Sequence, residues 1–315
     1  MSCCTGFPRL FPLVAVVGPT ATGKTAVSIR LAAELHAEIV NLDSVQVYKG
    51  LDIGSAKPTP REQAGIVHHL LDIREPFEPL DAATFSKIAA RRAETILERG
   101  RNCIFVGGTG FYLNALLSGL SHMPGHMPGI RSFLSDMHAK FGPGRLHGFL
   151  QQADPDAARR IHPNDTYRLV RALEVYMSSG MTFSSWCARI KPSPPAFAMQ
   201  RGCVIIGLAI PRESLYRRID ERVDQMIKQG FVEEVKGLLK KGLDPGLKAL
   251  QSLGYRHIIR YLQGGCTLKE AIADTKRDTR RYAKRQFTWY RKDPRIRWFD
   301  PRQLLACENI WEAVN

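Results

Sequence analysis

The stretch Gly18–Thr25 constrains the fold of this chain more than any other part of its sequence. It matches the phosphate-loop pattern G-x-x-x-x-G-K-[ST], with an apolar run at Leu13–Val17 before it and helical periodicity at Ala26–Leu35 after it. In such loops, backbone N–H groups face a di- or triphosphate, the lysine adds positive charge, and the Ser/Thr hydroxyl can hold Mg²⁺. We therefore predict a polyphosphate site made by Gly18, Pro19, Thr20, Ala21, Thr22, Gly23, Lys24 and Thr25. The pattern does not distinguish ATP from another polyphosphate.

Strand and helix patterns alternate beyond this loop. They predict strands at Glu38–Leu42, Cys103–Val106 and Cys203–Ile210, and helices at Ala83–Glu98, Glu213–Lys241 and Leu268–Arg291. Such alternation favours a mainly parallel sheet whose ligands bind at the carboxyl ends of the strands. We expect an α/β fold with a P-loop NTPase-like parallel sheet core, with Gly18, Asp43 and Gly107 at one edge of the sheet.

Two Pro- and Gly-rich stretches, Met123–Gly129 and Lys191–Phe197, bracket a section with helical periodicity and little strand character. We read them as hinges around an inserted α-helical domain. The expected organisation is therefore a first core part at 1–120, a helical insert at 121–200, and a core completion with basic C-terminal helices at 201–315.

Asp43 directly follows the predicted strand Glu38–Leu42. A carboxylate at the end of a strand in a P-loop enzyme can act as a general base. Aspartate is also a favoured cap residue that hydrogen-bonds the following turn. Both interpretations of Asp43 are open at this point.

The chain is strongly basic, with 45 Lys+Arg against 30 Asp+Glu and a formal net charge of +15. Residues 276–297 hold ten basic and two acidic side chains, a local charge of +8. A solvated charged helix face would explain this segment. Tyr282, Trp289 and Trp298 lie among the arginines, however, and aromatic rings that alternate with basic side chains favour nucleic-acid binding.

Composition also bears on the compartment and on metal ions. No apolar run approaches the ~20 residues that cross a bilayer, and the first dozen residues carry one arginine and no long apolar stretch. We expect a cytoplasmic protein with no membrane partner, although Cys3-Cys4 leaves a lipidated start open. The seven cysteines include no Cys-x-x-Cys pair, which argues against a cysteine-based zinc site.

Motifs along most of the chain resemble one family, the tRNA dimethylallyltransferases, also called tRNA isopentenyltransferases, in their bacterial form. The phosphate loop is shared with many NTPases and kinases, whereas the later motifs are far more specific. The motifs are GPTATGKT (18–25), DSVQVY (43–48), LDIGSAKP (51–58), HHLLDI (68–73), VGGTGFY (106–112), DPDAARRIHPNDTYRLVRALEVY (154–176), RIDERVDQM (218–226) and TRRYAKRQFTWYR (279–291).

The resemblance implies an activity and roles for residues. Enzymes of this family transfer the dimethylallyl group of dimethylallyl diphosphate to N6 of adenosine 37, next to the tRNA anticodon, with Mg²⁺. The implied reaction residues are Asp43 as the general base, Arg222 as a second clamp on the diphosphate, Lys24, Thr25 on the metal ion, and Thr109. The implied tRNA-binding residues are Asp43, Ser44, Val45, Gln46, Thr109, Arg131, Tyr167, Arg168, Leu169, Val170, Arg171, Gln251, Ser252, Leu253, Gly254, Tyr255 and Arg256. To these we add Arg281, Lys284 and Arg285 from the basic segment.

Two other classes of function compete with this one. A small-molecule kinase or nucleotide hydrolase would use the loop on ATP, but it leaves the basic segment and the insert unexplained. A non-catalytic RNA-binding module would explain the charge but not the loop. The expected partners are dimethylallyl diphosphate and the tRNA anticodon stem-loop, bound by a monomer.

Overall fold

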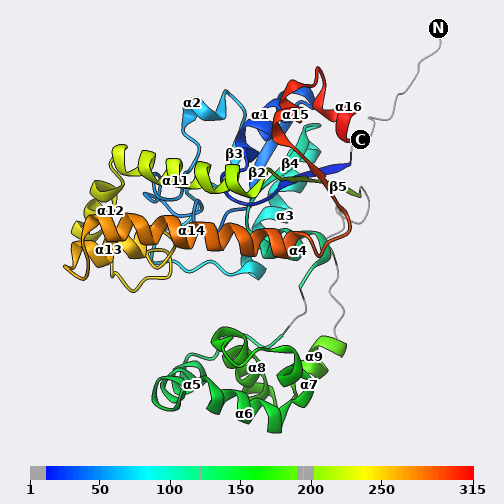
Figure 1. The fold of residues 1–315 in the computed structure, drawn as a ribbon. Coiled ribbons are helices and arrows are strands. Elements are labelled where there is room, and N and C mark those ends of the chain that lie inside the picture. Colours follow the sequence, from blue (N-terminus) through cyan, green and yellow to red (C-terminus); the bar gives the residue numbers. More distant parts are fainter. Residues whose placement is uncertain (1–11, 121–122, 190–193, 195–201) are drawn as a thin grey trace. The chain divides into compact units, whose positions relative to one another are not determined.

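The computed structural model describes residues 12–120, 123–189, 194 and 202–315, which form two compact units (Figure 1). The first unit comprises Met1–Leu117 and Pro195–Asn315, and the second comprises Ser118–Pro194. The expected hinge Met123–Gly129 falls at the start of the second unit. Apart from Pro194, the expected hinge Lys191–Phe197 lies outside the described residues, as does Cys3-Cys4.

The first unit is built on a six-stranded sheet with the order β3-β2-β4-β1-β5-β6, in which neighbouring strands pair in parallel. The strands are β1 (Leu13–Val17), β2 (Ala37–Asn41), β3 (His68–His69), β4 (Asn102–Gly107), β5 (Cys203–Leu208) and β6 (Ile296–Phe299). All residues of β1 and β2 are buried, as expected where helices cover both faces of a parallel sheet. The predicted α/β fold with a parallel sheet core is confirmed.

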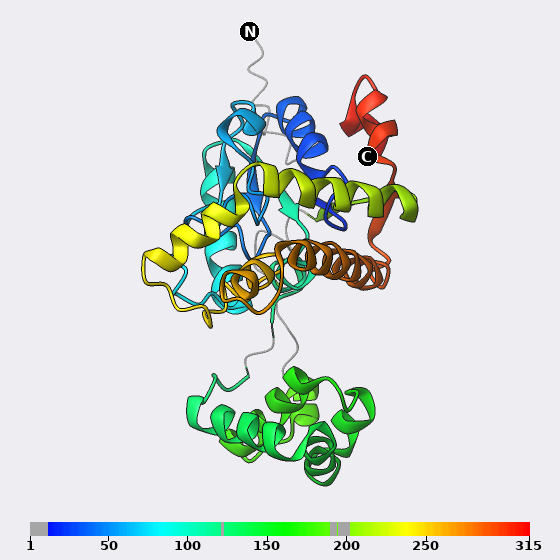
Figure 2. The same cartoon turned by 60° about the vertical axis from the view of Figure 1, so that its left-hand side comes forward.

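Helices cover both faces of this sheet (Figures 1 and 2). The helices described in this unit are α1 (Lys24–Glu34), α2 (Pro60–Gln63), α3 (Ala82–Glu98), α4 (Gly110–Ser118), α11 (Arg212–Lys228), α12 (Phe231–Lys240), α13 (Tyr255–Leu262), α14 (Leu268–Tyr290), α15 (Pro301–Ala306) and α16 (Ile310–Val314). On one face α1, α15 and α16 share an apolar core with the strands, and on the other α3 and α4 do so. Helices α12 and α13 join the second core at the segment that follows β2, where Phe231 and Tyr255 lie against Gly54.

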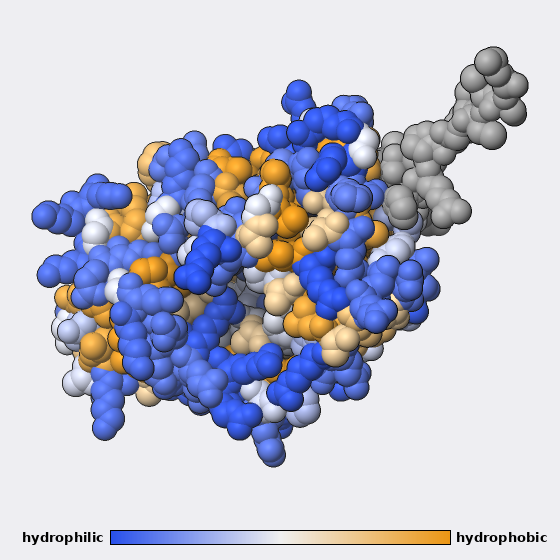
Figure 3. Space-filling model, turned by 90° about the horizontal axis from the view of Figure 1, so that it is seen from above, coloured by the Kyte–Doolittle hydropathy of each residue, from blue (hydrophilic) through white to orange (hydrophobic). Residues whose placement is uncertain are grey.

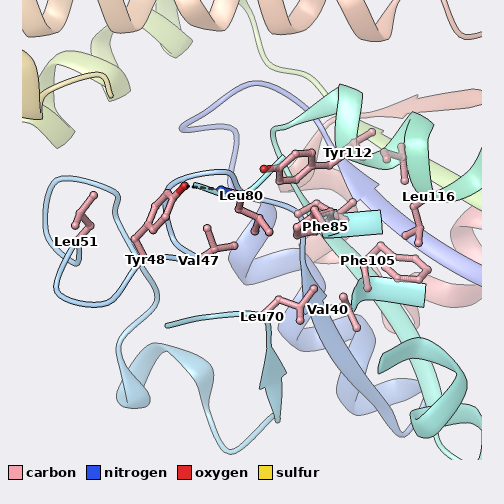
Figure 4. Close-up of a cluster of buried hydrophobic side chains, with 14 of the residues drawn as sticks. Val40, Val47, Tyr48, Leu51, Leu70, Leu80, Phe85, Phe105, Tyr112 and Leu116 are labelled. Atoms are coloured by element: carbon pink, nitrogen blue, oxygen red, sulfur yellow. Dashed lines mark hydrogen bonds between the residues drawn. The ribbon is translucent and has the colours of Figure 1, made fainter. Parts of the chain in front are cut away.

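Aromatic and aliphatic side chains fill the larger of these two cores (Figure 4). The rings of Phe85 and Tyr112 stack with their centroids 3.9 Å apart. The Tyr48 hydroxyl accepts a hydrogen bond from the Leu80 amide at 3.2 Å, which satisfies its polar end inside the core. This packing joins α3 and α4 to the segment that follows β2, and so fixes the loops at one edge of the sheet.

The structure adds detail to the sequence prediction. Helical structure fills Glu213–Lys241 as expected, but in two helices, because Gly230 (φ 97°) separates α11 from α12 in a left-handed conformation that favours glycine. The strand β6 at Ile296–Phe299 was not predicted. It is short and contains Arg297, so its sequence lacks the apolar run of a buried strand, yet it pairs in parallel with β5.

The second unit consists of helices packed around their own apolar core. They are α5 (Pro128–Phe141), α6 (Pro143–Ala153), α7 (Pro155–Arg160), α8 (Thr166–Ser179) and α9 (Phe183–Arg189). Leu134, Leu146, Leu150 and Leu169 are buried at its centre. Among the helices described in either unit, none has the length and apolar character that spanning a membrane requires.

Candidate active site

A cavity of about 690 Å³ opens at the carboxyl ends of β1, β2 and β4 in the first unit. Its walls come from the phosphate loop, the residues after β2, the glycines that end β4, and the facing sides of α11 and α14. Seen from above, the surface has a hollow with a largely hydrophilic rim (Figure 3). The position is the one where open parallel sheets bind ligands.

The phosphate loop is tightly curled. Gly18 has φ 143°, and a Cβ there would meet the Leu208 carbonyl oxygen at 2.6 Å, so only glycine fits between the loop and β5. The Lys24 ammonium donates to the carbonyl oxygens of Gly18 and Pro19 at 3.0 and 2.8 Å. Thr25 is exposed at the first turn of α1 and lines the cavity. Of the predicted loop residues, Thr20, Ala21, Gly23, Lys24 and Thr25 line the cavity, whereas Gly18, Pro19 and Thr22 do not.

Two positive side chains face the cavity from different elements. Arg222, on α11, donates to the Thr20 hydroxyl at 3.5 Å and so reaches the loop that carries Lys24. Burial, and next the Arg222 charge, lower the pKa of Lys24 to about 7, against the opposing effect of Asp43. Burial likewise lowers the pKa of Arg222, and Asp43 again opposes it. The site thus holds two poorly solvated basic groups, whose charged forms an anionic ligand would stabilise.

Asp43 serves the turn that follows it and still has a free oxygen. Its Oδ1 accepts hydrogen bonds from the amides of Val45 (2.8 Å) and Gln46 (3.3 Å). Its Oδ2 accepts none within the described chain, and the residue lines the cavity. The two interpretations of Asp43, cap and base, are therefore compatible in one side chain.

Other predicted residues lie around this carboxylate. Ser44, Val45 and Gln46 line the cavity, and the Gln46 carboxamide is fixed by hydrogen bonds to the carbonyl oxygens of Ser55 (3.1 Å) and Ala56 (3.0 Å). Thr109 follows β4, where its amide donates to the Leu42 carbonyl oxygen at 3.2 Å. This hydrogen bond joins the end of β4 to the residue that precedes Asp43.

Helix α14 contributes four cavity residues that we did not predict as part of the site, Thr275, Thr279, Tyr282 and Gln286. Gln286 is buried; its Oε1 accepts from the Thr20 amide and its Nε2 donates to the Gly108 carbonyl oxygen, both at 2.9 Å. A Cβ at Gly108 would lie 2.4 Å from that Nε2, so the glycine directly after β4 makes room for it. Tyr282, one turn earlier, also lines the cavity; burial, then the Asp43 charge, raise its pKa to about 12. The adjacent glycines Gly107 and Gly108 were the sequence signal that another side chain packs closely against the end of β4.

Comparison with known proteins identifies the family. The model of the IPP transferase family matches residues 46–293. The chain belongs to the IPP transferase family. It is 48% identical to the tRNA dimethylallyltransferase of Syntrophobacter fumaroxidans, over 92% of this chain and 83% of that one. It is 47% identical to that of Moorella thermoacetica, over 96% and 94%. The resemblance inferred from the motifs is confirmed.

Solved structures agree with this family. A full-length tRNA isopentenylpyrophosphate transferase from Bacillus halodurans matches with a TM-score of 0.67 and 41% identity, over 92% of this chain and 89% of that one. A eukaryotic dimethylallyltransferase acting on tRNA matches with a TM-score of 0.72 and 29% identity, over 89% of this chain and 69% of that one.

In this IPP transferase, the predicted tRNA-binding stretch Gln251–Arg256 divides into three parts. Ser252, Leu253 and Gly254 line the cavity, and Gln251 is exposed. Tyr255 is fully buried, and its hydroxyl donates to Glu234 Oε1 at 2.7 Å, so its side chain supports the fold. Arg256 is exposed but paired with Asp278 at 2.8 Å.

The predicted stretch Tyr167–Arg171 lies on α8 of the second unit and also divides by burial. Leu169 and Val170 are 0% and 5% exposed in the core of that unit, so their side chains cannot reach an RNA. Tyr167 is 67% exposed, and the Arg131 guanidinium lies over its ring at 5.5 Å. Arg171 pairs with the buried Glu174 at 2.9 Å. The remaining candidates of this unit are Arg131, Tyr167, Arg168 and Arg171.

Proposed function

We propose that this IPP transferase transfers the dimethylallyl group of dimethylallyl diphosphate to N6 of adenosine 37 in tRNA and releases diphosphate. The relatives that match nearly the whole chain are tRNA dimethylallyltransferases, which makes dimethylallyl transfer to tRNA the activity of the family. The observation that carries the proposal is the cavity where Lys24 and Arg222 lie near a carboxylate with a free oxygen.

Loss of the diphosphate is the first requirement of this chemistry. An allylic diphosphate ionises once the charge that develops on its leaving oxygens is stabilised. Loop amides, the Lys24 ammonium and the Arg222 guanidinium supply fixed positive charge where little water competes. These groups act on the leaving group and hold it in the loop.

The second requirement is removal of a proton from the attacking amine. The exocyclic amine of adenine is a weak nucleophile because its lone pair is delocalised into the ring. Asp43 Oδ2 accepts the N6 proton as the new C–N bond forms, a contribution typically worth 10²–10⁴-fold. The hydrogen bonds to Oδ1 hold the carboxylate in place during this step.

The residues present suit Mg²⁺. This ion prefers oxygen ligands and is usually held by one or two protein groups plus substrate phosphates. The exposed Thr25 hydroxyl at the start of α1 offers one such oxygen. No cluster of three or more His, Cys, Asp or Glu side chains able to hold a metal occurs in the described part of the chain. A bound Mg²⁺ would neutralise diphosphate charge beside Thr25.

Adenosine in a stacked anticodon loop cannot reach the cavity without leaving the stack. The protein must therefore hold the RNA around the extruded base. Exposed basic side chains at the far end of α14, Lys284 and Arg285, suit the RNA backbone. Arg131, Tyr167, Arg168 and Arg171 of the second unit suit the anticodon stem-loop.

One assay separates this function from the two alternatives. Unmodified tRNA, dimethylallyl diphosphate and Mg²⁺ are incubated with the protein, and the nucleoside at position 37 is analysed by mass. Addition of one dimethylallyl group at that adenosine is expected. A parallel reaction contains ATP and no tRNA. Phosphoryl transfer or ATP hydrolysis there, without prenylation in the first reaction, would favour the kinase or hydrolase class; RNA binding without either reaction would favour the binding module.

A further inference from the structure

Two aromatic rings are exposed together outside the cavity. Phe111, at the start of α4, is 49% exposed, and Trp289, at the end of α14, is 43% exposed. Their rings meet edge to face, with centroids 6.4 Å apart and an interplanar angle of 89°. Large apolar side chains that are exposed next to each other often mark a binding surface.

The indole is rigidly placed in spite of its exposure. A Cβ on Gly110 would lie 2.4 Å from Trp289 Cδ1 and 2.5 Å from its Nε1, so the indole rests directly on the backbone of α4. Glycine at this position is therefore required by the ring. A fixed, half-exposed indole offers a flat face to a ligand at little cost in side-chain entropy.

The surroundings of the pair are basic. Four exposed basic side chains are close in sequence. Arg285 and Lys292, four residues before and three after Trp289, share its side of the helix, whereas Lys284 and Arg291 point to other sides. None of them forms an ion pair with an acid within the described chain. Arg291 instead lies over the Phe287 ring at 4.2 Å. A partner with both planar rings and negative charge would match this surface, and single-stranded RNA has both.

Of the two elements that carry the rings, α14 lines the cavity, and α4 begins three residues after Gly107, which also lines it. Gln286, three residues before Trp289, lines the cavity and hydrogen-bonds to the loop. Thr109, two residues before Phe111, is tied to the carbonyl oxygen that precedes Asp43. The surface that leads outward from the cavity along α14 and α4 therefore reaches Phe111 and Trp289.

We propose that Phe111 and Trp289 form a stacking platform for an unpaired nucleobase of the tRNA that neighbours the target adenosine. The inference rests on the proposed function and names a contact that the reaction needs. Extrusion of one base removes a stacking partner from its neighbours. The Trp289 indole replaces that partner, Phe111 supports the indole from its edge, and the basic side chains hold the adjoining phosphates. Because every base has a π-face, the platform tolerates different neighbours.

Steady-state kinetics test the platform. Trp289→Leu and Phe111→Leu remove a ring and keep an apolar side chain, whereas Trp289→Phe and Phe111→Tyr are matched controls that keep one. We expect the leucine variant of Trp289 to raise the KM for tRNA roughly tenfold to a hundredfold, as loss of one base stack does. The KM for dimethylallyl diphosphate and the melting temperature should stay near those of the wild type. Trp289→Phe should restore most of the tRNA affinity.

A fluorescent base locates the contact. Anticodon stem-loops carry 2-aminopurine on the 5′ or the 3′ side of the target adenosine, and stacking quenches its emission. One of the two reporters should be quenched on wild-type protein and brighter on Trp289→Leu. Equal emission on both proteins, with an unchanged KM for tRNA, would overturn the platform. So would a dimer that dissociates in Trp289→Leu without any effect on tRNA.

These failures differ from a failure of the proposed function. A wild-type protein that does not prenylate tRNA would refute the function itself. A wild-type protein that prenylates tRNA, with a Trp289→Leu variant of equal tRNA KM, would refute only the platform. If Trp289→Leu lowers the melting temperature, Trp289→Phe and Phe111→Leu decide the question, because the first keeps an aromatic ring at position 289 and the second keeps the indole on Gly110.

Discussion

The two ends of α14 carry similar basic side chains but place them in different surroundings. In the part up to Arg280, which we call the paired half, Lys276 pairs with Asp224 at 2.6 Å, and Arg280 pairs with Asp220 at 2.5 Å. In the second half, Lys284 and Arg285 have no acidic partner within the described chain. The helix thus has a paired half and an unpaired half.

The difference shows that the net charge counted along a stretch of sequence is not the charge that is free to bind a ligand, because acids from another helix can neutralise part of it. The acids that pair with Lys276 and Arg280 come from α11, which lies alongside α14 (Figures 1 and 2). They are Asp220 and Asp224, and they flank Arg222, the side chain that reaches the phosphate loop. The paired half therefore fixes the helix that supplies a cation to the cavity, whereas the unpaired half is free to bind RNA.

The largest expected effect concerns the cavity that the paired half supports. Asp43→Asn keeps the shape of the side chain but cannot accept a proton. We expect turnover to fall roughly 10²-fold or more, while tRNA binding and its salt dependence stay nearly unchanged. Single-turnover prenylation and tRNA titration measure the two quantities. Near-normal turnover in this variant would exclude Asp43 as the base.

Removal of the cation carried by α11 should be the next largest effect. Arg222→Ala should lower kcat at least tenfold even when dimethylallyl diphosphate is saturating, because the guanidinium stabilises charge that develops on the leaving group. Arg222→Lys is the matched control that keeps the charge. A full rate at saturation would instead show that Arg222 binds substrate and transition state equally.

The unpaired half should control the salt dependence of tRNA binding. In the triple variant Arg281→Gln, Lys284→Gln and Arg285→Gln, log K against log salt should flatten by about 0.7 to 0.9 per lost phosphate contact. Arg281 is the weakest member, because it lies 3.5 Å from Asp278. The control replaces Lys276, Arg277 and Arg280 by Gln in the paired half. Equal flattening in both triple variants would contradict the division of α14.

The sequence predicts those parts of the site that depend on neighbouring residues. It does not predict contacts between residues that are far apart along the chain. The loop Gly18–Thr25 and the position of Asp43 follow from local patterns, and the structure has them at one edge of the sheet. Gln286 bonds to Thr20 across 266 residues, and Arg280 meets Asp220 across 60, so neither contact has a local signal.

The stretch Tyr167–Arg171 shows a different limit. The resemblance carries over a run of consecutive residues, whereas a helix exposes only some of them. Helical periodicity puts Leu169 and Val170 on the buried side of α8 and leaves Tyr167 and Arg168 outside. That signal was present in the sequence and would have narrowed the prediction.

The pKa of Lys24 gives a smaller effect that depends on pH. Burial and next the Arg222 charge lower this pKa to about 7, so the ammonium is charged below that pH and largely neutral above it. Bound diphosphate favours the charged form, so binding at pH 8 should take up close to one proton and weaken as the pH rises. Calorimetry with inorganic diphosphate, without metal and in buffers of different ionisation enthalpy, measures this uptake. Lys24→Arg should abolish the proton uptake that residue 24 contributes, because an arginine is already charged at pH 8. Equal proton uptake by both proteins would contradict the assignment to Lys24.

The smallest expected effect tests the paired half itself. Asp220→Asn removes the partner of Arg280, and because both side chains are about one-third exposed, the pair should contribute less than about 1 kcal/mol to the free energy of unfolding. The same change loosens α11 two residues from Arg222, so kcat/KM for dimethylallyl diphosphate should fall a few-fold while the salt slope of tRNA binding stays constant. Urea unfolding, combined in a double-mutant cycle with Arg280→Gln, measures the coupling. If Asp220→Asn instead steepened the salt slope, the freed Arg280 would be contacting RNA, and the pairing with α11 would be what keeps this half of the helix away from the tRNA.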